Sequence, residues 1–374
     1  MAVAQVREEE GGARVRVVLA PRYCPFASPA HHDAGLMTER GGRWLNGFGL
    51  GLREPERSRM LNNDCGEFYG RIMPRAPAGR LQLAVDWCTL MFAFDDAHCD
   101  EGPASVRPGD FARLASRVLR VLEVPRAVMG PPGDVLLTAV RDLAERGRAW
   151  STAVQWARVV EEHRGWFYGV LWEFACRAQD RTPTLNDYAH MRQHTAAGPA
   201  TLCWAEIVDG VEIPERDMAA TAVRALRELA FTTAAFDDDL FSYGKEQWLA
   251  ARSAHATGCR LNLVDILARE RGLPVHKALE EAVALTNRLT ARFARLREQV
   301  LPTASGPLRR HLDHLSTLLR GNAEWGLRAG RYSDPDGRHP GAVVTTGSFT
   351  DAAPPAGASG IAALSWLWEL PGYD

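Results

Sequence analysis

Residues 236–248 read FDDDLFSYGKEQW, and they are the most informative part of the sequence. Asp238, Ser242 and Glu246 recur at every fourth position, and at about 100° per residue their side chains span only about 80° of a helix circumference. Two carboxylates and a hydroxyl on one face are hard oxygen ligands of the kind that Mg²⁺ prefers. Lys245, beside the last of them, could bind a phosphate. Alternatively, the aspartates cap a helix and Ser242 is incidental, and the stretch alone does not decide between the two.

A second acidic segment lies upstream, at residues 92–101, which read FAFDDAHCDE. It follows the longest apolar run of the chain, so its carboxylates stand at the C-terminal end of a predicted helix, where the helix dipole favours cations. Asp96 and Asp100 are one helical turn apart and Asp95 adjoins them, so their oxygens could converge on a divalent cation. A solvated acidic turn is the commoner explanation of such a cluster taken alone.

The composition is that of an ordinary globular protein. Of 374 residues, 46% are hydrophobic and 24% are charged, and 44 basic against 46 acidic side chains leave a net charge of −2. A basic surface over the whole protein is therefore excluded, and we expect no nucleic-acid partner. The seven cysteines are scattered without a CxxC pair, which argues against a structural zinc site and against a disulfide framework.

The sequence predicts a cytoplasmic protein. Glu8, Glu9 and Glu10 stand where a secretory signal would need a cationic region followed by an apolar run. The most apolar window, residues 81–94, contains Asp86 and is shorter than the roughly 20 apolar residues that cross a bilayer. We expect no membrane span, and either a monomer or a homodimer.

Helices should form most of the regular structure, because Ala and Leu dominate and alternating β-branched runs are scarce. Val15–Leu19 is the one credible strand. Pro or small polar residues precede apolar periodic stretches at residues 108–110, 183–186, 214–215, 274 and 306–307, where helices should begin. The pattern is that of a helical bundle without a fixed-period repeat.

The predicted domain organisation is simple. We expect a flexible leader over residues 1–20, one helical domain over residues 21–335, and a tail rich in Pro and Gly over residues 336–374. The stretch 333–360 should be a loop or disordered.

Together, the two acidic segments resemble the motifs of class I terpene synthases, particularly those of bacteria. Residues 95–101 resemble the aspartate-rich motif, and residues 238–246 resemble the NSE motif, in the family's order. Arg192 precedes the second motif where bacterial members carry an arginine that senses diphosphate. Near the end of the chain, Trp325, Arg331 and Tyr332 resemble the family's W…RY element. The resemblance covers roughly residues 20–335.

The resemblance implies the all-α terpenoid synthase fold, a single-domain helical bundle around a central active-site cavity. It implies three Mg²⁺ ions, for which Mn²⁺ can substitute, and a small-molecule isoprenyl diphosphate that ionises to an allylic carbocation and cyclises. The metal ligands would be Asp95, Asp96, Asp100, Asp238, Ser242 and Glu246. The substrate diphosphate would be bound by Arg192, Lys245, Arg331 and Tyr332. Metal ions and such donors neutralise the leaving group without a general acid.

Aromatic faces stabilise a carbocation through cation–π attraction without supplying a nucleophile. Phe92 lies about one helical turn before Asp95, and Trp325 lies shortly before Arg331, so we expect both to line the cavity. Phe167, Tyr168 and Trp172 could join them, although aromatic residues at helical spacing more often form plain core.

The stretch 195–199, TAAGP, should interrupt a helix and expose backbone carbonyls. In similar bacterial synthases such a break follows the sensor arginine, and its linker and effector positions correspond to Thr195 and Ala196. A simple boundary between two helices accounts for the same residues.

Two positions depart from the family pattern. Cys99 stands where a DDxxD motif has its third acid, so either Asp100 or Glu101 would approach the metal. Asp238 replaces the more usual Asn at the first position of the NSE motif.

Members of this size most often act on farnesyl diphosphate, so we expect a sesquiterpene cyclase of bacterial secondary metabolism. Geranyl, methylated geranyl and geranylgeranyl diphosphate stay open as substrates. A chain-elongating prenyltransferase would carry two DDxxD motifs, which the Ser242 and Glu246 pattern argues against. A non-catalytic helical scaffold with solvent-facing acidic clusters is the remaining alternative.

Overall fold

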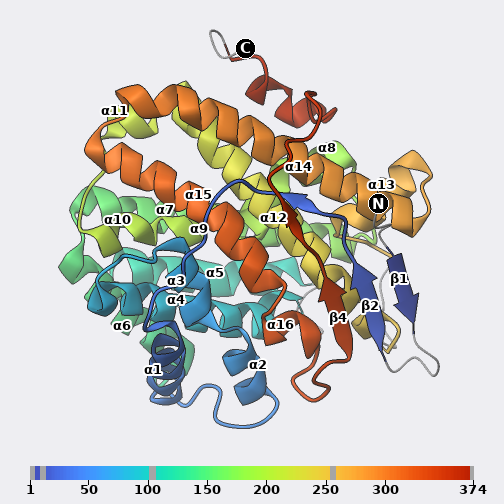
Figure 1. Cartoon of the computed structure of the whole chain (residues 1–374). Coiled ribbons are helices and arrows are strands. Elements are labelled where there is room, and N and C mark those ends of the chain that lie inside the picture. The colour runs from blue at the N-terminus through green and yellow to red at the C-terminus, as the bar shows by residue number, and fades with distance from the viewer. Residues whose placement is uncertain (1–4, 9–13, 101–106, 253–257, 371–374) are drawn as a thin grey trace.

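The computed structural model describes residues 5–8, 14–100, 107–252 and 258–370 and is mostly helical (Figure 1). The first helices are α1 (Ala34–Asn46), α2 (Glu56–Asn62), α3 (Cys65–Ile72), α4 (Ala78–Asp95), the π-helix η1 (Asp96–Asp100) and α5 (Pro108–Glu123). There follow α6 (Val135–Trp150), α7 (Ala153–Ala178), α8 (Leu185–Thr195), α9 (Gly198–Leu202), α10 (Trp204–Asp209), α11 (Glu215–Met218) and α12 (Thr221–Ala250). The last helices are α13 (Leu263–Arg271), α14 (Val275–Val300), the 3-10 helix η3 (Leu301–Thr303), α15 (Gly306–Gly326), α16 (Gly330–Ser333) and the 3-10 helix η4 (Ala362–Leu367).

The predicted helix starts are confirmed, since α5, α8, α11, α14 and α15 begin where Pro or small polar residues were expected to start them. Side-chain caps explain two of these starts. Thr184 accepts a hydrogen bond from the backbone N–H of Asp187, and Ser305 accepts one from that of Leu308. Such caps satisfy backbone donors that the first turn of a helix leaves unpaired.

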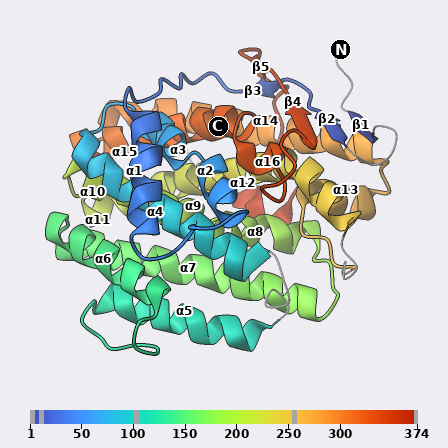
Figure 2. The ribbon, with the colours of Figure 1, turned by 90° about the horizontal axis from the view of Figure 1, so that it is seen from below.

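Helix α12 runs through the middle of the bundle. It packs most extensively on α14 and α15 and also contacts α8, α9 and α13. Figure 2 shows α5, α6 and α7 as a layer on one side of the molecule, with α14 and α15 on the other. Because α12 is surrounded in this way, most of its residues are buried, including charged ones such as Asp237 and Asp239. The second acidic motif is therefore inside the bundle.

Five short strands accompany the helices in the described part of the chain: β1 (Gln5–Glu8), β2 (Val15–Val18), β3 (Arg22–Tyr23), β4 (Val343–Thr346) and β5 (Phe349–Thr350). β1 pairs antiparallel with β2, β2 pairs parallel with β4, and β3 pairs parallel with β5. The predicted strand at Val15–Leu19 is confirmed as β2, whereas the sequence analysis missed the other four. The sequence predicts a loop or disorder over residues 333–360 and a flexible leader over residues 1–20, and the structure places strands in both segments.

The sheet of β1, β2 and β4 lies against the C-terminal half of α12, and Gly244 makes the close approach possible. A Cβ atom at Gly244 would lie 2.7 Å from Val343 Cγ1 and 3.1 Å from Val17 Cγ2. The two strands thus back the helix at the residues between Ser242 and Glu246.

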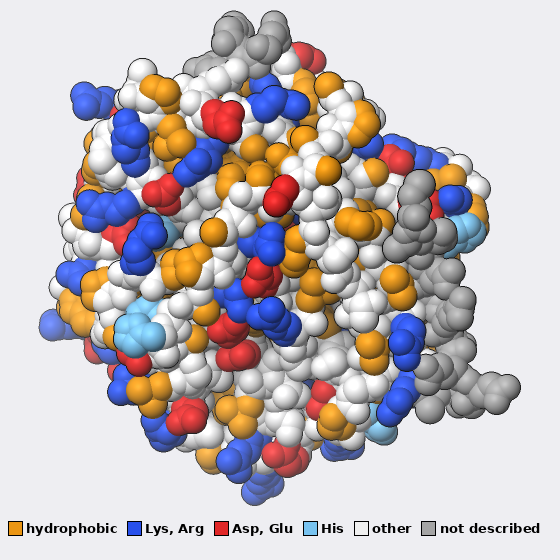
Figure 3. Space-filling model, viewed as in Figure 1, with side chains coloured by type: hydrophobic (Ala, Val, Ile, Leu, Met, Phe, Trp, Pro, Cys, Tyr) orange, Lys and Arg blue, Asp and Glu red, His pale blue; other side chains and the backbone are white. Residues whose placement is uncertain are grey.

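Acidic and basic side chains are interspersed over the face seen in Figure 3, in keeping with the small net charge. Among the described helices, none combines the length and hydropathy needed to cross a membrane. No cysteine in the described ranges forms a disulfide.

Candidate active site

A cavity of about 400 Å³ lies in the middle of the helical bundle. Its wall is formed by residues of α3, α4, η1, α7, α8, α9, α12, α13, α15 and α16, together with the segments that join α8 to α9 and α12 to α13. Of the residues predicted to form the site, those that line this one cavity are Phe92, Asp95, Arg192, Thr195, Ala196, Asp238, Ser242, Lys245, Glu246, Trp325, Arg331 and Tyr332.

The second acidic motif has the predicted helical geometry. Asp238, Ser242 and Glu246 lie within α12 and all line the cavity, so they share one face of the helix. The alternative, that the aspartates cap a helix, is wrong, because α12 begins at Thr221. Ser242 Oγ donates a hydrogen bond to Glu246 Oε1 at 2.6 Å, and Asn262 Nδ2 donates to the same oxygen at 3.2 Å. Burial raises the pKa of Glu246 to about 8, because desolvation of the charged carboxylate outweighs these two hydrogen bonds.

The three consecutive aspartates of α12 have different partners. Asp237 is fully buried and pairs with Arg22, whose Nε lies 2.6 Å from Asp237 Oδ1. Asp238 is part exposed and faces the cavity. Asp239 is buried and accepts hydrogen bonds from the Tyr188 hydroxyl at 2.8 Å and from Arg192 Nε at 2.9 Å. Of the three, only Asp238 presents its carboxylate to the cavity.

The first acidic motif continues the helix instead of forming a solvated turn. α4 ends at Asp95, and residues 96–100 form a single π-helical stretch, η1. The wider turn of a π-helix is frequent at functional sites. Asp95 and Cys99 line the cavity, and Arg177 Nη1 donates a hydrogen bond to the carbonyl of Cys99 at 3.1 Å. The side chain of Asp100, a predicted ligand, and the whole of Glu101 lie outside the described residues.

Arg331 connects α16 to the first motif. Its Nη1 lies 2.7 Å from Asp96 Oδ1, and its Nη2 lies 3.1 Å from Asp95 Oδ2. Burial alone would raise the pKa of Asp96, but the charges of Arg331 and Lys245 outweigh it and lower that pKa. Lys245 also lines the cavity, so two cationic side chains act on the first motif.

Arg192 and Tyr332 both contact Asp238. Arg192 Nη2 lies 2.6 Å from Asp238 Oδ2, and the Tyr332 hydroxyl donates a hydrogen bond to Asp238 Oδ1 at 2.5 Å. Burial and the charge of Asp238 raise the pKa of Tyr332, so its hydroxyl stays a hydrogen-bond donor. Predicted site residues from α8, α12 and α16 thus converge on one end of the cavity.

The predicted helix break is confirmed. α8 ends at Thr195, Ala197 has a φ of 57°, and α9 begins at Gly198. Thr195 Oγ1 accepts a hydrogen bond from Arg192 Nη1 at 3.1 Å, so the break is connected directly to the arginine. Ala196, Ala197 and Gly198 line the cavity.

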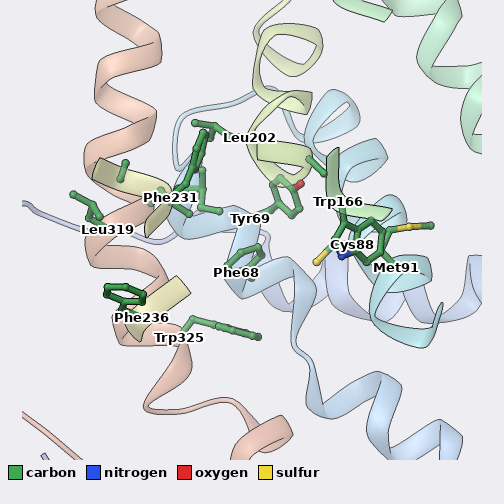
Figure 4. Close-up of a cluster of buried hydrophobic side chains, with 14 of the residues drawn as sticks. Phe68, Tyr69, Cys88, Met91, Trp166, Leu202, Phe231, Phe236, Leu319 and Trp325 are labelled. Atoms are coloured by element: carbon green, nitrogen blue, oxygen red, sulfur yellow. The ribbon is translucent and has the colours of Figure 1, made fainter. Parts of the chain in front are cut away.

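The cavity wall beyond the charged residues is rich in aromatic side chains. The rings of Phe92 and Trp325 stack with centroids 5.8 Å apart, and Phe68 lies 4.8 Å from Trp325. Figure 4 shows Phe68, Trp325 and Phe231 with Cys88, Met91 and Trp166 in this buried cluster. Phe92 and Trp325 therefore lie in the cavity wall, where the sequence predicts them.

The other three aromatic candidates do not line the cavity. Phe167 is buried in the core, Tyr168 is 62% exposed, and Trp172 is absent from the cavity wall. Sequence reasoning missed Phe68, Trp87, Trp166 and Phe231, which line it. Trp87 lies about two helical turns before Asp95 on α4, and Phe231 lies about two turns before Asp238 on α12. This spacing is the signal that could have found both residues.

The described donors fit a divalent cation. Asp95, Asp238, Ser242 and Glu246 line the cavity and offer hard oxygen ligands from two helical segments. Asp96 is not part of the cavity wall, but its carboxylate contacts Arg331, which is. Arg331, Arg192 and Tyr332 occupy the carboxylates that a cation would bind. The arrangement can bind metal ions and a multiply charged anion at the polar end, with an apolar group below.

Comparisons with known proteins agree with this geometry. The family model described as "Terpene synthase family 2, C-terminal metal binding" matches residues 86–292. The chain is 38% identical over 353 residues to phomopsene synthase from Allokutzneria albata, an alignment that covers 94% of this chain and 97% of that protein. It is 29% identical to diterpene cyclase DtcycA from Streptomyces sp, over 93% of this chain and 95% of that protein. The crystal structure of the SVS_A2 protein from ancestral sequence reconstruction is similar with a TM-score of 0.79 and 35% identity, covering 94% of this chain and 98% of that one.

Proposed function

Since the chain belongs to the bacterial class I terpene synthases, enzymes that cyclise isoprenyl diphosphates with the help of divalent metal ions, we propose that this cavity ionises a geranylgeranyl (C20) diphosphate and cyclises the resulting cation. The observation that carries the proposal is the meeting of two acidic motifs, on α4–η1 and on α12, at one end of a cavity whose remaining wall is rich in aromatic side chains. A polar end and an aromatic-rich wall match the two halves of an isoprenyl diphosphate.

We assign metal binding to Asp95, Asp96, Asp238, Ser242 and Glu246, with Asp100 as the further candidate from sequence. Mg²⁺ is the expected ion, three ions are expected, and Mn²⁺ can replace it. The ions, when bound, supply Lewis-acid neutralisation of the diphosphate leaving group.

The residues of the chain supply the directional contacts. Arg331 and Arg192 carry planar guanidinium groups that can donate two hydrogen bonds to one phosphate, which a lysine cannot do. Lys245 adds a point charge and Tyr332 a neutral donor. Arg331, Arg192 and Tyr332 each have an aspartate partner at the polar end. We expect substrate binding to exchange those carboxylates for phosphate oxygens.

The break after α8 would respond when Arg192 exchanges its carboxylate partner for a phosphate oxygen. Thr195 accepts a hydrogen bond from Arg192, so a shift of the guanidinium toward phosphate also moves the chain at Ala196. We assign Thr195 and Ala196 as the linker and effector positions of the resemblance. Their place in the cavity wall lets the backbone of the break contact the carbon chain as it ionises.

The cation formed on ionisation would lie among aromatic faces. Phe92 and Trp325 stack just below the polar end, where the allylic carbon would be released. Their π-faces attract a cation by about 0.5–2 kcal/mol each, more where water is excluded. The aromatic wall also keeps a nucleophile away from the cation until the rings have formed.

The choice of a C20 chain rests on the wall between α9 and α12. Apart from Phe231, the side chains that line the cavity there are small: Ala197, Gly198, Thr201, Ala234 and Ala235. Small residues leave room for a longer chain, and a relative named as a diterpene cyclase resembles this chain over nearly its whole length. Farnesyl diphosphate (C15), which the sequence analysis favoured, is the second candidate. The bulky Trp87 and Trp166 also line the cavity and narrow it, which favours a shorter chain.

Incubation with Mg²⁺ and one diphosphate at a time tests the proposal. Geranyl, farnesyl and geranylgeranyl diphosphate are supplied separately, then in equimolar competition, and hexane extracts are analysed by gas chromatography–mass spectrometry. A cyclic C20 product that dominates under competition is expected. A dominant C15 product supports the second candidate, longer prenyl diphosphates indicate a prenyltransferase, and no product with any substrate overturns the assignment as a cyclase.

A further inference from the structure

We propose that His163, a residue outside the cavity, is a positioning residue that fixes the orientation of the Trp87 indole in the cavity floor and thereby helps to select the cyclisation product. This inference rests on the proposed function, and it adds a determinant that lies behind the cavity wall. The two residues come from different helices, His163 from α7 and Trp87 from α4.

The geometry is a buried hydrogen bond between two rings. Trp87 Nε1 lies 2.6 Å from His163 Nε2, and the two rings are nearly perpendicular, at 85° with centroids 5.3 Å apart. Trp87 is 3% exposed and lines the cavity, whereas His163 is fully buried. An indole N–H can only donate, so the histidine nitrogen must accept.

The second ring nitrogen of His163 determines the tautomer. His163 Nδ1 lies 2.6 Å from the carbonyl oxygen of Val159, one turn earlier on α7. A carbonyl can only accept, so Nδ1 carries the proton and Nε2 offers its lone pair to the indole. Burial lowers the pKa of His163 to about 4, which keeps the ring neutral at physiological pH and preserves Nε2 as an acceptor. Both nitrogens are therefore occupied, and the ring cannot turn without losing a bond.

This arrangement holds one aromatic face of the floor at a fixed angle. The Trp87 ring also contacts Trp204, with centroids 5.8 Å apart, and Tyr69, with centroids 6.4 Å apart. These contacts restrict the position of the indole, and the hydrogen bond to His163 directs its N–H edge toward α7. Cation–π attraction depends on the ring face, so rotating the indole changes which carbon of the cation is stabilised.

Trp87 is far from the groups that act on the diphosphate. It lies two turns of α4 before Asp95, roughly 12 Å at about 1.5 Å per residue. Ionisation and cyclisation should thus respond differently to a change at residue 163. We expect diphosphate release to persist while the ratio of products changes.

Two amide substitutions of His163 form a matched pair for the test. In His163→Gln the side-chain oxygen can occupy the place of Nε2 and accept from Trp87. In His163→Asn the shorter side chain reaches only the place of Nδ1, so the bond to Trp87 is lost. Both variants are assayed for Mg²⁺-dependent diphosphate release and for product ratio with the substrate that the wild-type protein cyclises.

We expect His163→Asn to change the ratio of the main product to the others by about threefold or more, with diphosphate release within about threefold of wild type. His163→Gln should keep the wild-type ratio. Equal product ratios in wild type and His163→Asn would overturn the inference while leaving the proposed function intact. A wild-type protein that releases no diphosphate would instead overturn the proposed function.

A second measurement tests the hydrogen bond in the wild-type protein, so it does not depend on whether a His163 variant folds. In wild-type protein labelled with ¹⁵N-tryptophan, the indole resonance of Trp87 is assigned by its absence in Trp87→Phe. Because the indole N–H donates to His163, we expect its proton resonance to be shifted downfield and its exchange with water to be slow. An indole N–H with ordinary shift and fast exchange would contradict the geometry on which the inference stands.

Discussion

Arg331 and Asp96, 235 positions apart in the sequence, form an ion pair with Nη1 and Oδ1 2.7 Å apart. The side chains are 9% and 12% exposed, so the pair is largely out of water. It closes the polar end of the cavity by joining α16 to η1, and it connects a group that would bind diphosphate with one that would bind metal. The ion pair is therefore the contact that we expect substrate binding to break first.

Replacement of Arg331 tests this role. Arg331→Ala should lower kcat/KM for diphosphate release by about a hundredfold, the usual cost of removing one preorganised donor. Arg331→Lys keeps the charge but loses the planar fork that contacts Asp95 and Asp96, so it should recover about tenfold or less. The control is Arg328→Ala, an exposed arginine nearby, which should behave as wild type. A full recovery in Arg331→Lys would show that charge alone matters at this position.

Glu246 is the metal-ligand candidate that best separates function from folding. Because burial raises its pKa to about 8, the side chain is mostly protonated at neutral pH in the metal-free protein, and glutamine resembles that form. Glu246→Gln should therefore fold with the wild-type melting temperature. Its turnover should fall at least about a hundredfold, and added Mg²⁺ with diphosphate should raise its melting temperature less than that of wild type. Near-normal turnover would remove Glu246 from the metal site.

The aspartates of α12 give a pair of neighbouring variants with opposite expected effects. Asp237→Asn leaves the buried guanidinium of Arg22 without its carboxylate, which should cost about 3 kcal/mol of unfolding free energy. Asp238→Ala removes the ligand oxygens at the cavity and should cost at least about a hundredfold in turnover with little loss of stability. Urea denaturation and diphosphate release, both at low temperature, distinguish the two. The assignment of roles fails if Asp237→Asn is the less active of the pair once folded.

The buried imidazole of His163 predicts how stability depends on pH. Its pKa is about 4 in the folded protein, against an ordinary value of 6.5 for a solvated histidine, so between these values the unfolded chain binds a proton that the folded chain does not. Stability conferred by the neutral ring is complete above about pH 6.5 and is lost as pH falls toward 4.

At pH 5 this loss should amount to about 2 kcal/mol relative to pH 7. His163→Gln cannot take up the proton, so the difference in unfolding free energy between wild type and this variant should shrink by that amount on acidification. Using a difference cancels the contributions of the other buried groups. Parallel stability curves of the two proteins over pH 5–7 would show that His163 is not buried as a neutral ring.

Much of the fold and site could be predicted from the sequence because helical periodicity is local. The step of four residues from Asp238 to Ser242 to Glu246 is enough to place three oxygens on one face, and all three line the cavity. Likewise, Thr195–Pro199 carries its own chain interruption, whichever helices surround it.

What could not be predicted depends on partners that are distant in sequence. β4 has only four residues, and its pairing with β2 is visible only when both ends of the chain are brought together. The same holds for Trp87, whose place in the cavity and bond to His163 follow from how α4 packs on its neighbours. Motif spacing also gives no information on Asp237, since its partner Arg22 lies at the other end of the sequence.

The pairing of β2 with β4 has a consequence for the order of folding. Val17 emerges from the ribosome more than 300 residues before Thr345, its partner in the sheet, and such distant contacts are slow to form. The helices of the bundle can collapse during synthesis, but α12 is without its full backing at Gly244 until β4 has been made and has docked. We therefore expect the half of α12 that carries Ser242 and Glu246 to be the last part of the molecule to acquire its native environment, so that a newly made chain would become competent to bind metal only after β4 has docked.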